Sequence, residues 1–325
     1  MGEPQVSVLV PTWNRAAFLR PAIESVLAQS FGDLEVIVID DGSTDETPDV
    51  LAAVGDPRLR VLRLEHGGIS RALNRGLAAA RGELVARLDS DDLWLPDLLA
   101  LETGVLESRP DVEVVYARAE EIDENGDRVD AAPRGRPGRY PGEPFRSMLV
   151  EDFICNIAML APRRCFLEVG GYDETLATSE DWHLWLRMAQ RYRFAFLDRV
   201  VARYRRHGGN ITSSRSPDFV GFVEGRTRVL DKIFAEPDLE PSHRRMRRES
   251  YASVHTWSGF VWLGNGRWAP ALRAFGRAVA SSDRRPETIA RIGWALTTRF
   301  LERLPLGPRV VGAVRGAARR VIQKP

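Results

Sequence analysis

Short apolar runs alternate with amphipathic segments over the first 100 residues of the chain. The apolar runs, at 5–10, 34–40, 59–64 and 83–88, are near-continuous, as in strands that are covered on both faces. Between them, apolar residues recur at helical spacing in 16–29 and in 69–80. Ser43 and Glu46 have the spacing of a capping box, which predicts a short helix opening at Ser43. The alternation predicts βαβ units around a mostly parallel sheet flanked by helices.

The second half of the chain has a more mixed pattern. It predicts strands at 112–117, at 156–161 and within 193–204, and a mobile loop rich in Pro, Gly and Arg at 134–144. Apolar spacing from Trp182 to Ala189 predicts a helix whose first turn holds Glu180 and Asp181. From Pro217 onward the pattern is helical. We therefore expect two domains, an α/β domain at 1–215 and a basic helical C-terminal region at 216–325.

Charge divides the chain in the same way. Residues 241–325 hold 17 Arg or Lys and 4 Asp or Glu, a net charge of +13. Because the whole chain has a formal net charge of +1, residues 1–240 carry −12. This contrast in net charge suggests two regions with different functions. The hydrophobic content of 44% and the charged content of 28% are those of a soluble globular protein.

Cysteine usage and the amino terminus point to the cytoplasm. Cys155 and Cys165 are the only cysteines and lack metal-ligand spacing, so we expect reduced, buried thiols. The amino terminus enters a strand without a preceding basic region, so we expect no secretory signal. We expect no nucleic-acid partner, and the sequence indicates no oligomeric state.

Acidic residues gather at three places where predicted elements end or begin. They are Asp40-Asp41, Asp89-Ser90-Asp91-Asp92 and Glu180-Asp181. Ligands of α/β sheets bind at the carboxyl ends of the strands, and hard divalent cations select carboxylate oxygens. Taken alone, the Asp89–Asp92 segment is equally typical of a solvated turn before a helix, and Glu180-Asp181 of a favourable first helical turn.

The order and spacing of four motifs carry a family resemblance. They are VSVLVPTWNRAAFLRPAIESVLAQSF, LEVIVIDDGSTDET, ARGELVARLDSDD and SEDWHLWLRM. Together they resemble a family 2 inverting glycosyltransferase with the GT-A fold, a Rossmann-like α/β fold, over roughly residues 5–210. A GxGxxG after the first strand is absent, which argues against a dinucleotide oxidoreductase.

The resemblance implies a nucleotide site and a metal site. It assigns nucleotide binding to Pro11, Thr12, Trp13, Asn14, Arg15, Asp41, Asn74, Asp89 and Ser90. Asp91 and Asp92 would bind Mn²⁺ or Mg²⁺ between protein and diphosphate, with Asp91 the direct ligand and Asp89 holding ribose. His207 is a further metal candidate, with an ordinary surface-loop histidine as the alternative. Asp41 suits uracil or guanine, since a carboxylate accepts N–H groups from either base.

The resemblance also implies the reaction. Asp181 would be the catalytic base, taking a proton from an acceptor hydroxyl as its oxygen attacks the anomeric carbon. The implied donors are UDP-, GDP- or dTDP-sugars, and the acceptor is a glycan, a lipid-linked glycan or another hydroxyl compound, as in polysaccharide biosynthesis. The alternatives are a sugar nucleotidyltransferase and a catalytically silent sugar-nucleotide binding protein.

A last expectation concerns the basic tail. Residues 309–322 form a small apolar stripe of Val, Ala and Ile beside four arginines. Anionic lipid attracts such segments, which predicts peripheral contact with the inner membrane face. Packing of the tail on the acidic region of its own or a neighbouring chain is the alternative.

Overall fold

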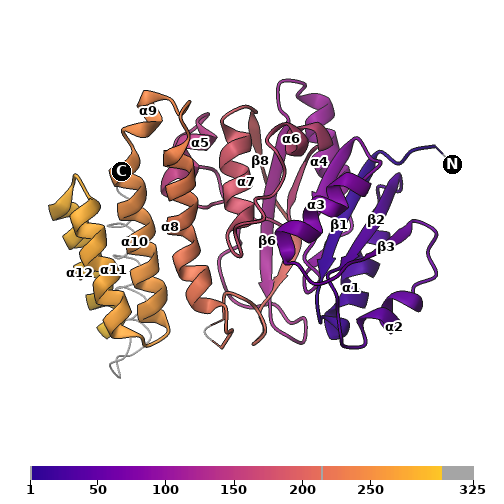
Figure 1. Cartoon of the computed structure of the whole chain (residues 1–325), viewed down its shortest axis with the longest axis horizontal. Helices are drawn as coiled ribbons and strands as arrows, with labels where there is room; N and C mark the ends of the chain where they lie inside the picture. The colour runs from indigo at the N-terminus through magenta and orange to yellow at the C-terminus, as the bar shows by residue number, and fades with distance from the viewer. Residues whose placement is uncertain (1, 214, 302–325) are drawn as a thin grey trace. The chain divides into compact units, whose positions relative to one another are not determined.

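The first part of the protein is built on an eight-stranded mixed sheet with helices on both faces (Figure 1). The structure is a computed structural model, which describes residues 2–213 and 215–301. The strand order is β3-β2-β1-β4-β7-β6-β8-β5. The elements, in chain order, are β1 (Val6–Thr12), α1 (Ala16–Leu27), β2 (Leu34–Asp40), α2 (Thr47–Ala52), β3 (Leu59–Arg63), α3 (Ile69–Ala79), β4 (Leu84–Arg87), β5 (Leu93–Trp94), α4 (Leu98–Ser108), β6 (Val114–Ile122), α5 (Pro144–Val150), β7 (Met159–Pro162), α6 (Arg163–Glu168), α7 (Glu180–Ala189), β8 (Phe194–Arg205), α8 (Phe219–Ala235), α9 (Pro241–Arg244), α10 (Arg247–Gly264), α11 (Trp268–Ser281) and α12 (Arg285–Leu301).

The strands predicted from continuous apolar runs form the parallel half of the sheet. β3, β2, β1 and β4 lie side by side and parallel, and every residue of β1, β2 and β4 is buried. Alternate side chains face opposite layers: Val8 packs in the layer that contains Ile23 of α1, whereas Leu9 lies beside Gly76 of α3. A Cβ at Gly76 would stand 2.8 Å from Ile39, so glycine permits this close approach of helix and sheet.

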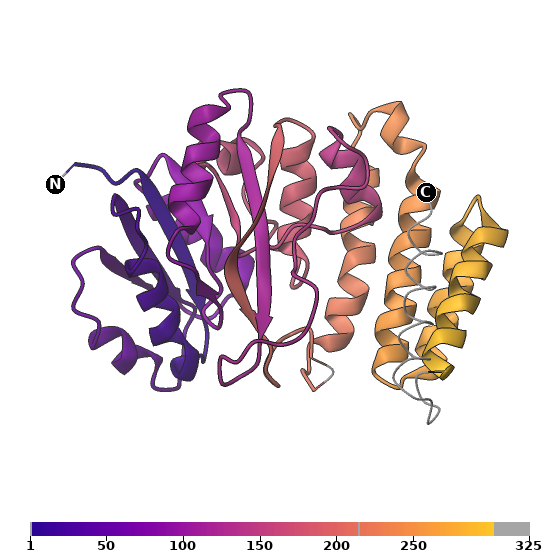
Figure 2. The same cartoon turned by 180° about the vertical axis from the view of Figure 1, so that it is seen from behind.

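Three antiparallel pairings and one parallel pairing complete the sheet. β7 pairs antiparallel with both β4 and β6, and β6 runs parallel to the long strand β8 (Figure 2). The two-residue strand β5 pairs antiparallel with the far end of β8, placing Leu93 opposite Arg203. Since β5 directly follows Asp89–Asp92, this pairing brings the end of β8 to the acidic segment.

Several local expectations are corrected by the structure. α5, α6 and β5 were not predicted, and the strand predicted at 156–161 begins only at Met159. Ser43 makes no capping box: α2 begins at Thr47, and the Ser43 hydroxyl accepts the backbone N–H of Asn14 instead. The 134–144 segment is tied to the fold, because Arg134 bridges to Ala119 and donates to Glu121.

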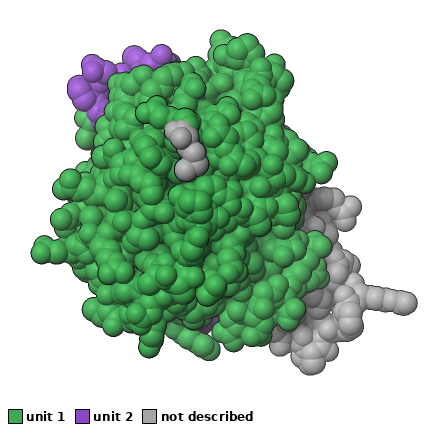
Figure 3. All heavy atoms as spheres, turned by 90° about the vertical axis from the view of Figure 1, so that its right-hand side faces the viewer, with its two compact units in different colours: residues 1–235 green, residues 236–325 purple. Residues whose placement is uncertain are grey.

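The chain divides into two compact units, residues 1–235 and 236–325, which Figure 3 shows in green and purple. α8 belongs to the first unit, where it contacts α7, and the division falls directly after α8. In the second unit α11 packs against α10 and α12. The tail stripe at 309–322 lies outside the described residues. Within the described residues, no helix is both long and apolar enough to cross a membrane.

Candidate active site

Two of the acidic segments follow parallel strands that flank β1, at the same edge of the sheet. Asp41 comes directly after β2, and one residue, Leu88, separates Asp89 from the end of β4. Because β1 lies between these strands, its following loop, which holds Trp13, Asn14 and Arg15, lies between the two acidic segments. The third segment, Glu180-Asp181, opens α7.

Asp41 is buried and holds the loop that leads into α3. Its two carboxylate oxygens accept the backbone N–H groups of Gly67, at 3.0 Å, and Gly68, at 2.8 Å. Gly68 has φ +92°, a conformation that a side chain makes unfavourable. Asp40 instead closes its own turn by accepting the backbone N–H of Ser43. Asp41 thereby fixes the shape of this end of the site.

The loop after β1 presents an aromatic surface beside Asp41. Trp13 is 48% exposed and stacks on the ring of His66, with centroids 4.3 Å apart and planes 19° from parallel. Pro11 and Thr12 are buried in β1. Asn14 has φ 52°, and its side-chain oxygen accepts the N–H of Thr44. Asn14 therefore ties two loops together, and Trp13 with His66 provides the flat surface.

Asp91 meets His207 at the end of β8. Nε2 of His207 lies 2.9 Å from Oδ2 of Asp91, and Nε of Arg15 lies 3.6 Å from the same oxygen. Nδ1 of His207 accepts the N–H of Gly209, which leaves the proton of a neutral ring on Nε2, facing Asp91. Arg15 also donates to the carbonyl of Gly209. The structure thus brings together two of the three predicted metal ligands.

Asp92 points the other way, into the protein. It is 1% exposed, and Oδ1 accepts the backbone N–H of Arg205. Within the described residues Oδ2 has no hydrogen-bond partner. Burial raises the pKa of Asp92 well above its usual range, and the nearby carboxylates of Asp91 and Asp89 raise it further. Asp92 anchors β8 in this geometry, and its role as a metal ligand stays a prediction. Ser90 is buried beside it.

Asp89 is linked to the third acidic segment by an arginine that the motifs did not single out. Nε of Arg87 donates to Asp89 at 2.7 Å, and its Nη1 donates to Glu180 at 3.1 Å. Burial, followed by the neighbouring Asp181, raises the pKa of Glu180 to about 7. Asp181 follows in the first turn of α7, where Oδ1 accepts its neighbour's backbone N–H. The predicted base therefore lies in the same carboxylate cluster as Asp89.

Asp152 is a further carboxylate of this cluster that sequence reasoning missed. It accepts a hydrogen bond of 2.8 Å from Arg226 of α8. Burial raises its pKa to about 6; Arg226 opposes this shift and Asp181 adds to it. No local sequence motif indicates this ion pair, because 74 residues separate Asp152 from Arg226.

Asn74 faces a loop in this structure. Its amide donates to the carbonyl of Tyr172 and to Glu174, and its oxygen accepts the N–H of Tyr172. Asn74 thus clamps the 171–174 loop onto α3, and the predicted contact with a nucleotide stays a prediction.

The residues at the edge of the sheet fit a divalent cation in part. Within the described residues, no group of three or more His, Cys, Asp or Glu has the arrangement of a complete metal site. The 2.9 Å between Nε2 of His207 and Oδ2 of Asp91 is a hydrogen-bond distance, and a cation held by both atoms would replace the proton on Nε2. Magnesium-type sites use one or two protein ligands and complete their shell with substrate phosphates and water. The donor set fits that pattern.

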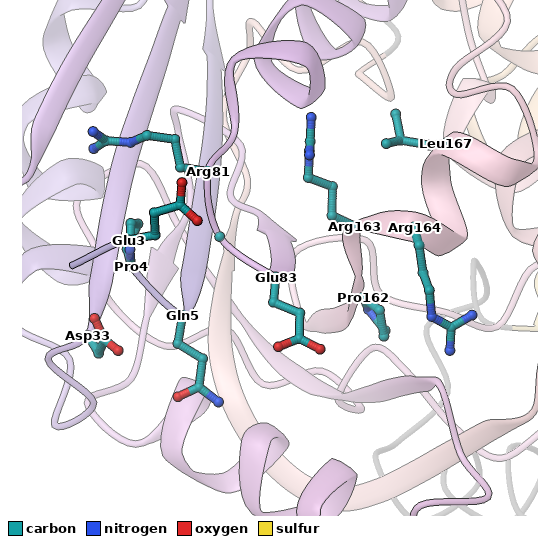
Figure 4. Close-up of a pocket in the computed structure, with 11 residues that line it drawn as sticks. Glu3, Pro4, Gln5, Asp33, Arg81, Glu83, Pro162, Arg163, Arg164 and Leu167 are labelled. Carbon is teal, nitrogen blue, oxygen red and sulfur yellow. The ribbon is translucent and has the colours of Figure 1, made fainter.

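A separate cavity of about 680 Å³ opens at the amino ends of the parallel strands, away from these residues (Figure 4). Its lining carries both signs of charge, including Arg81, Arg163, Arg164, Glu3 and Glu83. The candidate catalytic residues do not line it.

Comparison with known proteins gives one family model and several relatives. The model described as "Glycosyl transferase family 2" matches residues 7–165. An uncharacterized glycosyltransferase of Rickettsia prowazekii (strain Madrid E), RP339, is 30% identical over 236 residues, which cover 72% of this chain and 74% of the relative. Chondroitin synthase of Escherichia coli is 29% identical over 212 residues, covering 64% of this chain and 30% of that protein.

Solved structures share the fold. TarS 1–349 of S. aureus, in complex with UDP-GlcNAc, superposes with a TM-score of 0.66 at 20% identity, covering 90% of this chain and 87% of that one. The mannosyltransferase PcManGT of Pyrobaculum calidifontis, in complex with GDP-Man and Mn²⁺, superposes with a TM-score of 0.60 at 20% identity, covering 99% and 85%. At this identity the likeness concerns the fold, which is the expected GT-A type.

Proposed function

The chain belongs to glycosyl transferase family 2 and is a glycosyltransferase, and on that premise we propose that it is an inverting enzyme which moves a sugar from a nucleotide-sugar to a hydroxyl acceptor. The fold neighbours TarS and PcManGT were solved with UDP-GlcNAc and with GDP-Man, which supports a nucleotide-sugar as the donor. The donors proposed are UDP-, GDP- or dTDP-sugars, and the acceptors a glycan, a lipid-linked glycan or another hydroxyl compound.

The nucleoside would bind across the loops after β1 and β2. Trp13 offers an exposed ring face for stacking with a base. Oδ1 of Asp41 accepts the backbone N–H of Gly67 and has a second lone pair for an N–H of uracil or guanine, whereas Oδ2 accepts the N–H of Gly68 and lies 2.9 Å from Nδ1 of His66. Asp89 would accept a ribose hydroxyl.

Asp91 and His207 would hold a divalent cation, Mn²⁺ or Mg²⁺, together with the diphosphate. When bound, such a cation neutralises the negative charge that develops on the departing nucleoside diphosphate. PcManGT, solved with Mn²⁺, supports the choice of metal. Arg15, 3.6 Å from Asp91, adds a fixed positive charge on the same side.

Asp181 would remove the proton from the acceptor hydroxyl while the acceptor oxygen bonds to the anomeric carbon. The bond from that carbon to the diphosphate oxygen breaks on the opposite side, and its electron pair leaves with the diphosphate. A single displacement of this kind inverts the anomeric centre and needs no protein nucleophile. A helix amino terminus favours the ionised, proton-accepting form of a carboxylate.

The observation that carries the proposal is the link from Asp89 through Arg87 to Glu180, the neighbour of Asp181. It joins the strand end predicted to bind donor to the helix predicted to bear the base, across 93 residues of sequence.

Two measurements test the proposal. Thermal stabilisation by UDP, GDP and dTDP with Mn²⁺ identifies the nucleotide, because a ligand that binds only the folded state raises Tm. Release of nucleoside diphosphate from the matching sugar nucleotides, and the anomeric configuration of the product, then report transfer and its stereochemistry. Stabilisation without turnover would favour the silent binding protein, and formation of pyrophosphate from a sugar phosphate and a nucleoside triphosphate would favour the nucleotidyltransferase.

A further inference from the structure

Arg87 is a buried cation at the end of β4. Its side chain is 5% exposed, and it bonds to carboxylates from two separate parts of the fold. Nε donates to Asp89 in the segment after β4, and Nη1 donates to Glu180 in the first turn of α7. Tyr172, in the loop before α7, lies close enough to the guanidinium to interact with it. One guanidinium therefore joins the donor side of the site to the helix that carries the predicted base.

The chemistry of arginine suits this junction. A guanidinium has five N–H donors in a rigid planar fork, so it can hold two carboxylates at a fixed angle. A lysine ammonium carries the same charge but is a point donor on a flexible stem. A buried arginine with two carboxylate partners also loses most of its freedom of movement, so the groups bound to it share one geometry.

The loop before α7 is also held by α3. Asn74 of α3 holds the backbone of Tyr172 through both its N–H and its carbonyl. Tyr172 in turn contacts Arg87. Ser179, the residue before α7, has φ 58°, so the chain turns sharply into the helix at this point. The first turn of α7 is thus positioned by contacts with β4 and α3.

We propose that Arg87 is a positioning residue for the transfer reaction: its guanidinium fixes the first turn of α7, and with it Asp181, relative to the donor-site carboxylate Asp89. This rests on the proposed function of Asp181 as the base. Arg87 itself touches neither donor nor acceptor in this assignment.

The charges around the first turn of α7 make the proposal measurable. Glu180 faces Arg87 and Asp181, and Asp181 lies near Asp89, Asp152 and Tyr172. Arg226, Arg134 and Arg136 are the cations beside Asp152. Among these groups Arg87 is the cation bonded to Glu180. Its removal makes the proton on a neighbouring carboxyl harder to lose.

The experiment compares three variants with the wild-type protein. Arg87→Met removes the charge, Arg87→Lys keeps the charge without the fork, and Arg58→Met removes a partly exposed arginine that is bonded to Asp56 and the carbonyl of Leu27. NMR of ¹³C-labelled glutamate carboxyl groups, assigned with Glu180→Gln, follows the titration of Glu180 without any donor. Nucleotide binding is measured as thermal stabilisation by UDP and by GDP with Mn²⁺. Catalysis is measured as diphosphate release from UDP-GlcNAc and GDP-mannose with water as acceptor.

In Arg87→Met the Glu180 titration should move upward by about one pH unit or more. The value of kcat should fall about 10–100-fold, as for other losses of a residue that orients a reactive group. The donor KM should stay within about threefold, and the acid limb of kcat/KM should move to higher pH. Arg87→Lys should restore the titration and recover kcat only in part. Arg58→Met should match the wild type in every readout.

An unchanged Glu180 titration in Arg87→Met, or wild-type kcat in either Arg87 variant, would overturn the proposal. If Arg87→Met does not fold, the kcat of Arg87→Lys decides alone, since Lys keeps the charge and loses the fork. If the wild-type protein transfers sugar from no donor, the proposed function fails. The NMR titration still tests the Arg87–Glu180 link in that case, so the two failures are distinguishable.

Discussion

His207 and Asp91 lie 116 residues apart in the sequence and 2.9 Å apart in the structure, Nε2 to Oδ2. The contact exists because β5 pairs with the far end of β8, which delivers His207 to the acidic segment after β4. Arg205 strengthens the same junction, because its backbone N–H donates to Asp92 and its Nε donates to the carbonyl of Asp91. This edge of the sheet is where we expect the cation and the diphosphate.

Asp91→Asn should abolish the metal dependence of nucleotide binding. The amide cannot supply the anionic oxygen that a hard cation selects. We expect the affinity for UDP or GDP in the presence of Mn²⁺ to fall about 10-fold or more, to the level that the wild type shows with a chelator. Calorimetric titration with and without Mn²⁺ measures this. Asp198→Asn, at a carboxylate with 73% exposure, is the control. Metal-dependent binding of normal strength in Asp91→Asn would remove Asp91 from the metal site.

Asp181→Asn should separate binding from transfer. The amide keeps the shape of the side chain but cannot accept the acceptor's proton, so kcat should fall about 10²–10⁴-fold. Nucleotide-induced stabilisation should persist. Steady-state kinetics together with thermal shifts measure both effects. Transfer at the wild-type rate would mean that another carboxylate is the base, and Glu180→Gln would then be the next variant.

Asp41→Ala and Trp13→Ala should both weaken nucleotide binding but should differ in their effect on stability. Asp41→Ala removes two charge-assisted hydrogen bonds to Gly67 and Gly68, so it should lower both the nucleotide affinity and the free energy of unfolding, the latter by about 1.5–3 kcal/mol. Trp13→Ala removes an exposed stacking surface and should lower the affinity with little change in Tm. Denaturant unfolding and nucleotide titration separate the two. Equal losses of stability in both variants would contradict this division.

The buried carboxyl group of Glu102 should make the protein less stable as pH rises. It is fully buried in α4, and within the described residues neither carboxylate oxygen has a hydrogen-bond partner. Burial raises its pKa well above the usual 4.5. The folded protein therefore keeps a proton that the unfolded chain releases, so the free energy of unfolding falls as pH rises above about 4.5.

Glu102→Gln should for this reason raise Tm at pH 8 and leave it nearly unchanged at pH 4. Each 1 kcal/mol gained corresponds to about 2–4 °C in a domain of this size. Glu107→Gln, at an exposed position of the same helix, is the matched control. A stabilisation by Glu102→Gln that does not depend on pH would show that the carboxyl is not held neutral.

The basic tail is predicted from its sequence to bind anionic membranes. Each arginine near an anionic surface contributes about 1 kcal/mol, screened by salt. The intact chain should therefore co-sediment with anionic vesicles at low salt, and lose this binding at high salt or when it is cut after Pro305. If the intact chain ignores anionic vesicles at low salt, the tail packs on protein instead.

The sequence by itself determined the parallel half of the fold and the three acidic segments. A continuous apolar run such as Leu34–Asp40 is stable as a strand that is covered on both faces. The spacing between such runs leaves room only for crossover helices. Asp41 and Asp91 could be predicted as ligand-binding residues because the chain places each shortly after such a strand, and local order alone sets that position. The family resemblance rests on the same local motifs.

The tertiary structure alone decided which remote groups meet. The pairs Arg87–Glu180 and Asp152–Arg226 join residues 93 and 74 positions apart, and the antiparallel insertion of β7 has no local signal. Asn74 lies on the predicted helix, yet only the packed loop shows that its amide holds Tyr172. A hydrophobic pattern specifies which face of an element is buried, because burial depends on each residue's own side chain. The partner of a buried charge depends on the geometry of the whole fold.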